Sequence, residues 1–163
     1  MNLRPLSLIA GLLLLAACAQ NPSTNASAGG GGGAATTAPG SASVAPGSSQ
    51  DFVQNVGDRV FFDFDKSAIK PEGRTTLQRQ AEWLKKYPNV SVTVEGHCYE
   101  RGTREYNLAL GERRATAVRN ALVALGISPN RIKTISYGKE RPAVLGSNEA
   151  AWAQNRRGVT VIN

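Results

Sequence analysis

Between residues 5 and 50 the chain has no Asp, Glu, Lys or Arg, whereas 18 of its 19 basic and all 12 acidic residues follow residue 50. All ten Phe, Trp and Tyr residues also follow residue 50. A stretch without aromatic side chains that is rich in Gly, Ser, Ala and Thr cannot bury enough apolar surface to offset its ordering entropy. The sequence therefore predicts a folded domain at residues 51–163, and it excludes a chain that is disordered throughout.

Residues 1–17 predict an export signal. Arg4 gives a positive start, and the apolar run 6–15 would span only about 15 Å as a helix, roughly half the hydrocarbon layer of a bilayer. The run ends in Leu-Ala-Ala-Cys, with the cysteine at Cys18. This resembles the lipobox of bacterial lipoproteins, in which cleavage precedes a lipidated cysteine. We expect Cys18 to carry lipid; the alternative is a plain signal peptide with a chance cysteine. Ala19 favours the outer membrane by the same resemblance, with the domain in the periplasm.

Residues 18–50 then predict a flexible tether behind the lipidated cysteine. The segment consists largely of Gly, Ser, Ala, Thr and Pro, and it includes five consecutive glycines at 29–33. As a coil it would average about 28–34 Å from end to end. Such a reach suits a domain that is anchored to a membrane and acts on something beneath it.

Residues 51–163 predict a single α/β domain. Hydrophobic periodicity and chain breakers place strands at 60–64, 90–95, 132–137 and 158–162, and helices at 71–87 and 105–125. A further short helix, capped by Ser147, runs to residue 155. The order βαβαβαβ predicts a two-layer sandwich with the helices on one face of a sheet.

The helix at 105–125 places a charge on its apolar side. At about 100° per residue, Arg114 lies at the centre of the apolar stripe, and Asn107 lies on the same side. A charge buried without a partner costs several kcal/mol. We therefore expect Arg114 to meet an anionic ligand in a pocket beside the loop at 96–102, or an internal carboxylate, for which the candidates are Asp63, Asp65 and Glu95.

His97 and Cys98 do not predict a catalytic or metal site. His97 is the only histidine, and a metal or nucleophilic site needs further ligands or a base and its orienting partner. Cys98 has no partner if Cys18 is lipidated, so it is expected to be buried as a small hydrophobe. No enzyme activity, cofactor or metal is predicted.

Six motifs follow one another in this domain: FDFDK at 62–66, VEGH at 94–97, ERGT at 100–103, EYNLALGERRA at 105–115, YGKERPAVLG at 137–146 and NRR at 155–157. In this order and spacing they resemble the peptidoglycan-associated lipoprotein (Pal) family, whose domain belongs to the wider OmpA-type class. The resemblance covers most of residues 61–162, and the lipobox and tether agree with it.

The resemblance implies an outer-membrane lipoprotein that binds peptidoglycan without cleaving it and tethers the outer membrane to the cell wall. The ligand would be meso-diaminopimelate in an uncrosslinked stem peptide. TolB and the Tol complex would be partners in envelope integrity and cell division, with 137–146 either part of that surface or a structural loop. The implied peptidoglycan-binding residues are Phe64, Asp65, His97, Tyr99, Arg101, Asn107, Leu110 and Arg114.

Individual roles follow from the same resemblance. Arg114 would bind the ligand carboxylate through its guanidinium fork, and Arg101 would contact a second carboxylate. Asn107 would hydrogen-bond the ligand, Leu110 would pack on its aliphatic chain, and Phe64 and Asp65 would line the pocket.

Tyr99 departs from the family pattern, because it stands where the family has the aspartate that takes the ligand's ammonium. A phenol with a pKa near 10 is neutral at pH 7 and offers no countercharge, so the affinity for diaminopimelate is expected to be weaker. A lipoprotein that acts mainly as a protein-interaction module is therefore a second reading of these residues.

An enzyme that acts on peptidoglycan and a general binder of polyanions both fit the residues less well. The enzyme would need a nucleophile and base or a metal, and the sequence offers only His97 beside Cys98 and Glu100. The polyanion binder would use the excess of basic residues after residue 50, but these are spread along the chain. An exported protein is not expected to meet nucleic acid.

Overall fold

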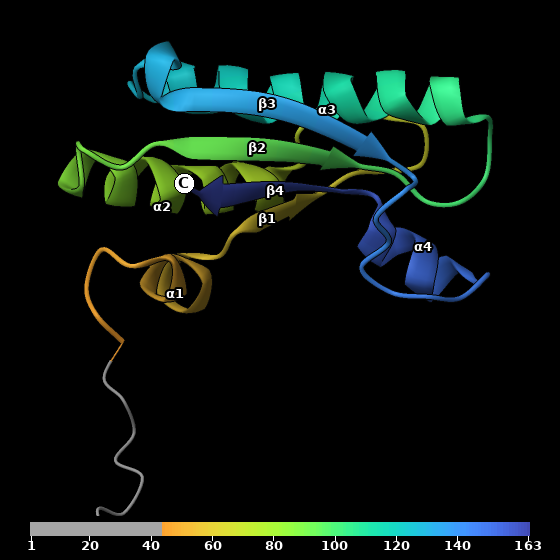
Figure 1. The fold of residues 1–163 in the computed structure, drawn as a ribbon, viewed down its shortest axis with the longest axis horizontal. Coiled ribbons are helices and arrows are strands. Elements are labelled where there is room, and N and C mark those ends of the chain that lie inside the picture. Colours follow the sequence, from red (N-terminus) through yellow and green to blue (C-terminus); the bar gives the residue numbers. More distant parts are fainter. Residues whose placement is uncertain (1–43) are drawn as a thin grey trace, which may run out of the picture. The chain divides into compact units, whose positions relative to one another are not determined.

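The computed structural model describes residues 44–163; the predicted signal peptide, Cys18 and the tether up to residue 43 lie outside the described part. The described residues form a four-stranded sheet of order β1-β4-β2-β3 (Figure 1). The strands are β1 (Arg59–Phe61), β2 (Val92–His97), β3 (Ile132–Gly138) and β4 (Arg157–Ile162). The helices are α1 (Ser49–Asp51), η1 (Phe52–Val56), α2 (Pro71–Lys86), α3 (Arg104–Ala124), η2 (Pro129–Arg131) and α4 (Glu149–Asn155).

The predicted α/β sandwich is confirmed, with β1, α2, β2, α3, β3, α4 and β4 in the expected order. β4 lies between β1 and β2 and is antiparallel to both, whereas β2 and β3 are parallel. The two long helices, α2 and α3, cover one face of the sheet, and α4 lies at its end (Figure 1). The C-terminal ends of β1 and β2 are therefore close to the start of α3.

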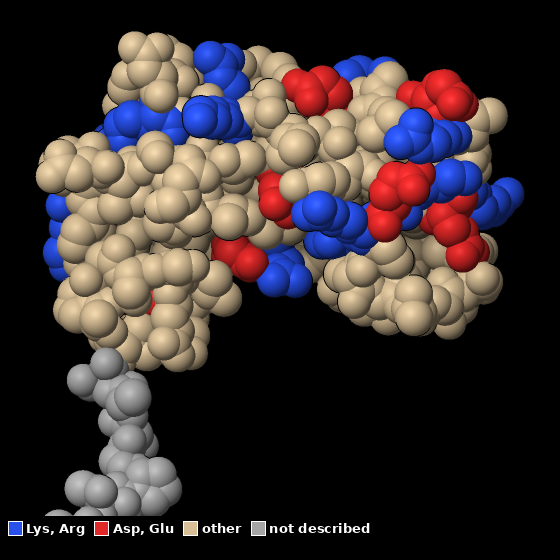
Figure 2. Space-filling model, viewed as in Figure 1, with Lys and Arg blue, Asp and Glu red and all other residues tan. Residues whose placement is uncertain are grey.

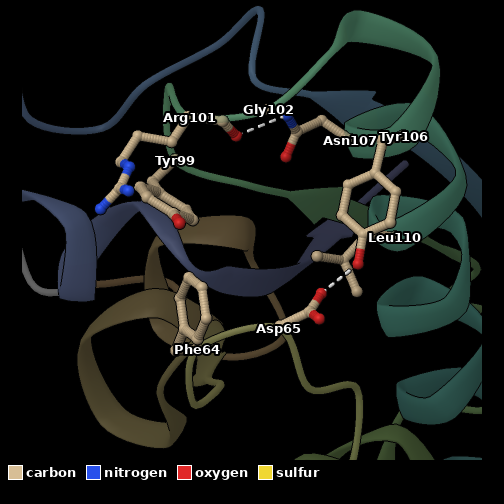
Figure 3. Close-up of a pocket in the computed structure, with 8 residues that line it drawn as sticks. All are labelled: Phe64, Asp65, Tyr99, Arg101, Gly102, Tyr106, Asn107 and Leu110. Atoms are coloured by element: carbon tan, nitrogen blue, oxygen red, sulfur yellow. Dashed lines mark hydrogen bonds between the residues drawn. The ribbon is translucent and has the colours of Figure 1, made fainter.

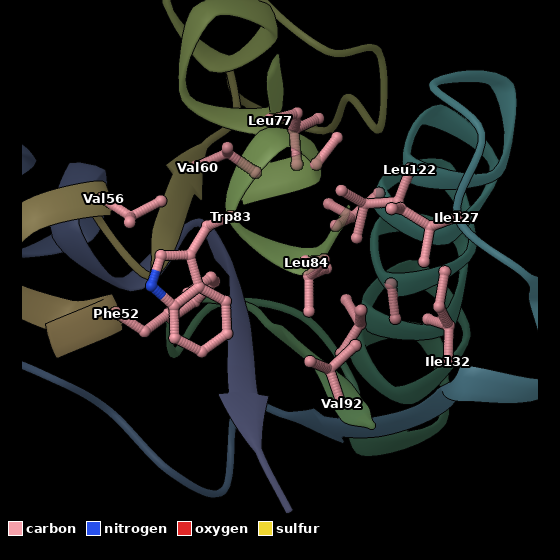
Figure 4. Packing of buried hydrophobic residues seen from close by; sticks show 14 of the residues in the cluster. Phe52, Val56, Val60, Leu77, Trp83, Leu84, Val92, Leu122, Ile127 and Ile132 are labelled. Carbon is pink, nitrogen blue, oxygen red and sulfur yellow. The ribbon is translucent and has the colours of Figure 1, made fainter. Parts of the chain in front are cut away.

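The core lies between the sheet and the two long helices. Val92 and Val94 alternate along β2 and point inward, where they pack with residues such as Leu84 from α2 and Leu122 from α3 (Figure 4). Each of these four side chains is fully buried. Full burial of such a side chain contributes about 1.5–3 kcal/mol, so this contact fixes α3 against the sheet.

The helical segment at 49–56 was not predicted. The ring of Phe52 packs edge-on against Trp83, with 4.9 Å between ring centroids. The indole Nε1 of Trp83 donates a hydrogen bond to Oδ2 of Asp51 at 2.9 Å. The segment thus covers the outer part of α2 and joins the folded domain.

Several element boundaries differ from the predictions by one to three residues. β2, predicted at 90–95, runs from Val92 to His97 and so includes the first two residues of the predicted loop at 96–102. The strand predicted at 60–64 runs from Arg59 to Phe61, because Phe61 pairs with Arg157, the residue at which its partner strand β4 begins. The predicted cap of α4 is also wrong by one residue: the Oδ1 of Asn148, not Ser147, accepts a hydrogen bond from the amide of Ala151 at 3.0 Å.

A pair of glycines lets α3 approach β2 closely. A Cβ atom on Gly96 in β2 would lie 1.8 Å from the carbonyl oxygen of Gly111 in α3. One on Gly111 would lie 2.3 Å from Oγ of Ser136 in β3. The first half of α3 is therefore held directly on the end of the sheet, beside the loop that follows β2.

Candidate functional site

A cavity of about 300 Å³ opens where β1 and β2 end. Its walls come from three segments: the loop after β1, the loop after β2, and the first turns of α3 (Figure 3). The residues that line it are Phe64, Asp65, Tyr99, Arg101, Gly102, Tyr106, Asn107 and Leu110. Its volume is at the lower end of the range for small-ligand pockets.

Asn107 fastens the loop after β2 to α3. Its side chain is buried, and its Nδ2 donates hydrogen bonds to the carbonyls of Arg101 and Thr103, both at 2.9 Å. Thr103 also begins α3, since its Oγ1 accepts from the amide of Tyr106 at 3.2 Å. Both side-chain N–H groups of Asn107 are therefore used within the protein, which leaves its Oδ1 for a ligand.

The same loop is held from its other side by β3 and α4. The ammonium of Lys139 donates to the carbonyls of Glu100 and Gly102, at 3.2 and 2.7 Å. The indole Nε1 of Trp152 donates to the Oε1 of Glu100 at 3.1 Å. The loop is thus fixed at both ends before any ligand binds, which lowers the entropic cost of binding.

Arg114 lies beneath the cavity rather than in its lining. Its side chain is 0% exposed, and its guanidinium donates to three backbone carbonyls, those of Lys66 at 2.9 Å, His97 at 2.8 Å and Asp63 at 3.2 Å. Among residues 44–163 no carboxylate forms a salt bridge with it. The internal ion pair, which the sequence left open as an alternative to a bound anion, is therefore not formed. Carbonyls of the loop after β1 and of His97, the last residue of β2, take its hydrogen bonds instead.

The surroundings of Arg114 keep its charge compatible with burial. The guanidinium lies over the ring of Phe62, 5.2 Å from its centroid, and donates to the Sγ of Cys98 at 3.4 Å. Burial lowers the pKa of Arg114 below its ordinary range and raises the pKa of the Cys98 thiol. As expected, Cys98 is buried.

Asp65 and Tyr106 meet across the cavity from different segments. Tyr106 is in the first turn of α3, is 45% exposed, and donates its phenolic hydrogen to the Oδ1 of Asp65 (Figure 3). This hydrogen bond is the main cause of a raised pKa of Tyr106. Asp65 is the only acidic residue in the lining, and Arg101 is the only basic one.

Tyr99 is largely buried, with 7% exposure, between two aromatic rings. Its ring centroid lies 6.0 Å from that of Phe64 and 5.7 Å from that of Trp152. Phe64 is 62% exposed and forms an open wall of the cavity. Tyr99 thus contributes an aromatic surface and not a charge.

His97 lies outside the cavity lining. Its side chain is 1% exposed and its Nε2 is 3.2 Å from Oε2 of Glu95. Burial and the nearby charge of Arg157 lower the pKa of His97 from 6.5 to about 4, so the ring is neutral at pH 7. Its link to the site is its carbonyl, which accepts from Arg114.

Six of the eight predicted binding residues therefore line the cavity together; His97 and Arg114 do not. Sequence reasoning missed Gly102 and Tyr106. Tyr106 lies three residues after Thr103, a residue type that favours helix N-caps, so it belongs to the first helical turn facing the loop. No group of His, Cys, Asp and Glu within residues 44–163 could hold a metal ion. None of the helices in that range has the length and apolar character needed to cross a membrane.

Comparison with known proteins shows clear sequence relatives. The OmpA family matches residues 61–156. The peptidoglycan-associated lipoprotein of Brucella melitensis is 56% identical over 124 residues, which are 76% of this chain and 74% of that protein. The protein of the same name from Mesorhizobium japonicum is 50% identical over 155 residues, 95% of this chain and 89% of that protein.

Solved structures share the fold. The crystal structure of the peptidoglycan-associated lipoprotein from Burkholderia pseudomallei aligns with a TM-score of 0.63 and 45% identity, over 65% of this chain and 90% of that one. The C-terminal domain of Helicobacter pylori MotB aligns with a TM-score of 0.61 at 23% identity, over 65% of this chain and 84% of that one. The second likeness concerns the fold alone.

Proposed function

The chain belongs to the OmpA family, and from that premise we propose that it binds peptidoglycan non-covalently and tethers the outer membrane to the cell wall. The observation that supports this most is the charge arrangement of the cavity. It presents one carboxylate, Asp65, one guanidinium, Arg101, and the apolar side chain of Leu110. Such a lining suits a ligand with an ammonium, a carboxylate and an aliphatic chain, and the free end of meso-diaminopimelate has all three.

The remaining predicted residues have supporting roles in this proposal. Asn107 accepts from the ligand through its Oδ1, and Arg114 contributes positive potential from below while it positions both cavity loops. His97 acts through its backbone carbonyl. The relatives named peptidoglycan-associated lipoprotein support peptidoglycan as the binding partner. TolB and the Tol complex, with 137–146 as part of the docking surface, belong to the proposal as partners.

The charges on the surface favour a specific site over general binding of polyanions. On the face in Figure 2, Lys and Arg side chains lie among Asp and Glu toward the right, a small basic group lies at the upper left, much of the left side is uncharged, and no large continuous basic area is seen. Local pairs such as Arg104 with Glu140, at 3.3 Å, and Arg156 with Glu149, at 2.6 Å, neutralise individual basic side chains. Binding to the cell wall is therefore assigned to the cavity.

Purified sacculi test this function directly. The full-length protein in detergent should sediment with diaminopimelate-containing sacculi, and an excess of soluble muropeptide ending in diaminopimelate should release it. No muropeptides should appear in the supernatant, because binding without cleavage is proposed. Failure to sediment, or sedimentation that the muropeptide does not compete, would favour a protein-interaction module. Release of muropeptides would contradict the non-enzymatic proposal.

Lipidation of Cys18 gives a second prediction. A Cys18→Ser protein should move from the membrane fraction to the soluble periplasmic fraction, because stable anchoring needs two or more acyl chains. The measurement is an immunoblot of fractionated cells, with Cys98→Ser as the matched control that should stay with the membrane. Wild-type amounts of Cys18→Ser in the membrane pellet would contradict the lipoprotein assignment.

A further inference from the structure

The cavity contains one acidic side chain whose position is fixed from two directions. The backbone of Asp65 has a φ of 55°, a left-handed conformation that Asp and Asn tolerate better than most residues. The hydroxyl of Tyr106 donates to its Oδ1. These two constraints aim the carboxylate at the cavity and leave its Oδ2 available there (Figure 3).

The neighbouring acidic residues are engaged elsewhere. Asp63 lies within 3.4 Å of the ammonium of Lys70 and 4.0 Å of that of Lys66. Glu100 accepts from the indole of Trp152 at 3.1 Å. Among residues 44–163 no Lys or Arg forms a salt bridge with Asp65. Asp65 is therefore the cavity's one source of negative charge for a cation.

The walls beside Asp65 also favour a cation. Three aromatic side chains, Phe64, Tyr99 and Tyr106, line the same cavity. The faces of aromatic rings attract an ammonium, and the attraction adds to that of a nearby carboxylate. Tyr99 takes part as a ring, since it is packed against Phe64 and Trp152.

We propose that the ligand's side-chain ammonium binds to the carboxylate of Asp65, oriented by Tyr106, and that Tyr99 forms an aromatic wall of this subsite. The proposal rests on the proposed function and adds that Asp65 is the residue that recognises the ligand's amino group. The negative charge that pairs with the ammonium then comes from the loop after β1. In the family pattern it comes from an aspartate at position 99, in the loop after β2, where this chain has Tyr99. Tyr106 is a positioning residue, because it acts through Asp65.

Asp65→Asn is the central variant, because asparagine keeps the size, tolerates the positive φ and can still accept from Tyr106. Only the charge is lost. Binding of a soluble muropeptide ending in diaminopimelate, measured by calorimetry on the full-length protein, should weaken about 10- to 100-fold. Asp63→Asn removes the same charge two residues away, outside the cavity lining, and should bind like wild type.

A modified ligand makes the test specific. The same muropeptide acetylated on its side-chain amino group should bind wild type and Asp65→Asn with affinities within about twofold of each other, because the group that Asp65 recognises is gone. Tyr106→Phe keeps the charge and removes the orienting hydroxyl. It should weaken binding of the unmodified muropeptide by a smaller factor, about 3- to 10-fold.

The outcomes separate this inference from the proposed function. If wild type fails to bind the unmodified muropeptide, the proposed function itself is wrong. If wild type binds it and Asp65→Asn binds equally well, the ammonium subsite is not at Asp65. If Asp65→Asn loses the same factor with the acetylated ligand, Asp65 acts on folding or loop position and the inference is overturned.

Discussion

Gly96→Ala is expected to lower the free energy of unfolding by at least about 4 kcal/mol, the largest effect of a single substitution in this domain. The added Cβ would lie 1.8 Å from the carbonyl oxygen and 2.5 Å from the carbonyl carbon of Gly111. Both atoms belong to the backbone of α3, so no side-chain rotation relieves the overlap. The helix would have to leave the sheet, with loss of the packing around Val118 and Leu122.

Urea unfolding of the full-length protein followed by circular dichroism measures this loss, and an insoluble or unfolded variant would agree with it. Gly73→Ala in α2 is the matched control. Its Cβ would meet only side-chain atoms, the nearest at 3.3 Å, and alanine is the better helix former. It should stay within about 1 kcal/mol of wild type. Equal stabilities of Gly96→Ala and Gly73→Ala would contradict the close packing of α3 on β2.

Arg114→Met is expected to cost about 3–5 kcal/mol of stability. Methionine fills part of the volume but donates no hydrogen bonds, so the carbonyls of Asp63, Lys66 and His97 lose their charged donor. Such carbonyls are costly when they stay away from water without a partner. The two cavity loops should also separate, so ligand affinity should fall together with stability.

Arg114→Lys distinguishes this structural role from direct ligand binding. Lysine keeps the charge, but one ammonium cannot reproduce donors aimed at carbonyls of the loop after β1 and of the end of β2. We expect the variant to unfold at lower urea concentration, whereas Arg113→Lys, at the exposed neighbouring position, should not. Wild-type stability with a tenfold or greater loss of muropeptide affinity would show that Arg114 binds the ligand itself.

The sequence predicted those parts of the fold that depend on periodicity and chain breakers. Val92 and Val94 alternate on β2, and Gly126, with a φ of 94°, follows the end of α3. The end of β1 was missed because alternation continues through the Phe-Asp-Phe run, whereas the strand ends at Phe61, where its partner β4 begins at Arg157. The segment 49–56 was missed because its stability depends on the distant Trp83.

Six of the eight residues that line the candidate site were named from the sequence, but the contacts that hold them in place were not. The helical stripe correctly predicted that Arg114 is buried. The hydrogen-bond partners of Arg114 could not be identified from the sequence, because they are backbone carbonyls, which every residue has and which no sequence pattern marks. The contact between Asp65 and Tyr106 likewise joins residues 41 positions apart, and only the folded chain brings them together.

The placement of the cavity has a mechanical consequence. The described chain enters the domain beside α1, near one end of the sheet, whereas the loops of the cavity are at the opposite end (Figure 1). In the proposed tether, a pull between membrane and wall therefore runs along the strands. The hydrogen bonds between antiparallel β1 and β4 lie perpendicular to that direction, so the load shears them together instead of peeling them apart one at a time. A domain loaded in this way resists force better than its equilibrium stability alone would suggest, because rupture under tension depends on the unfolding rate.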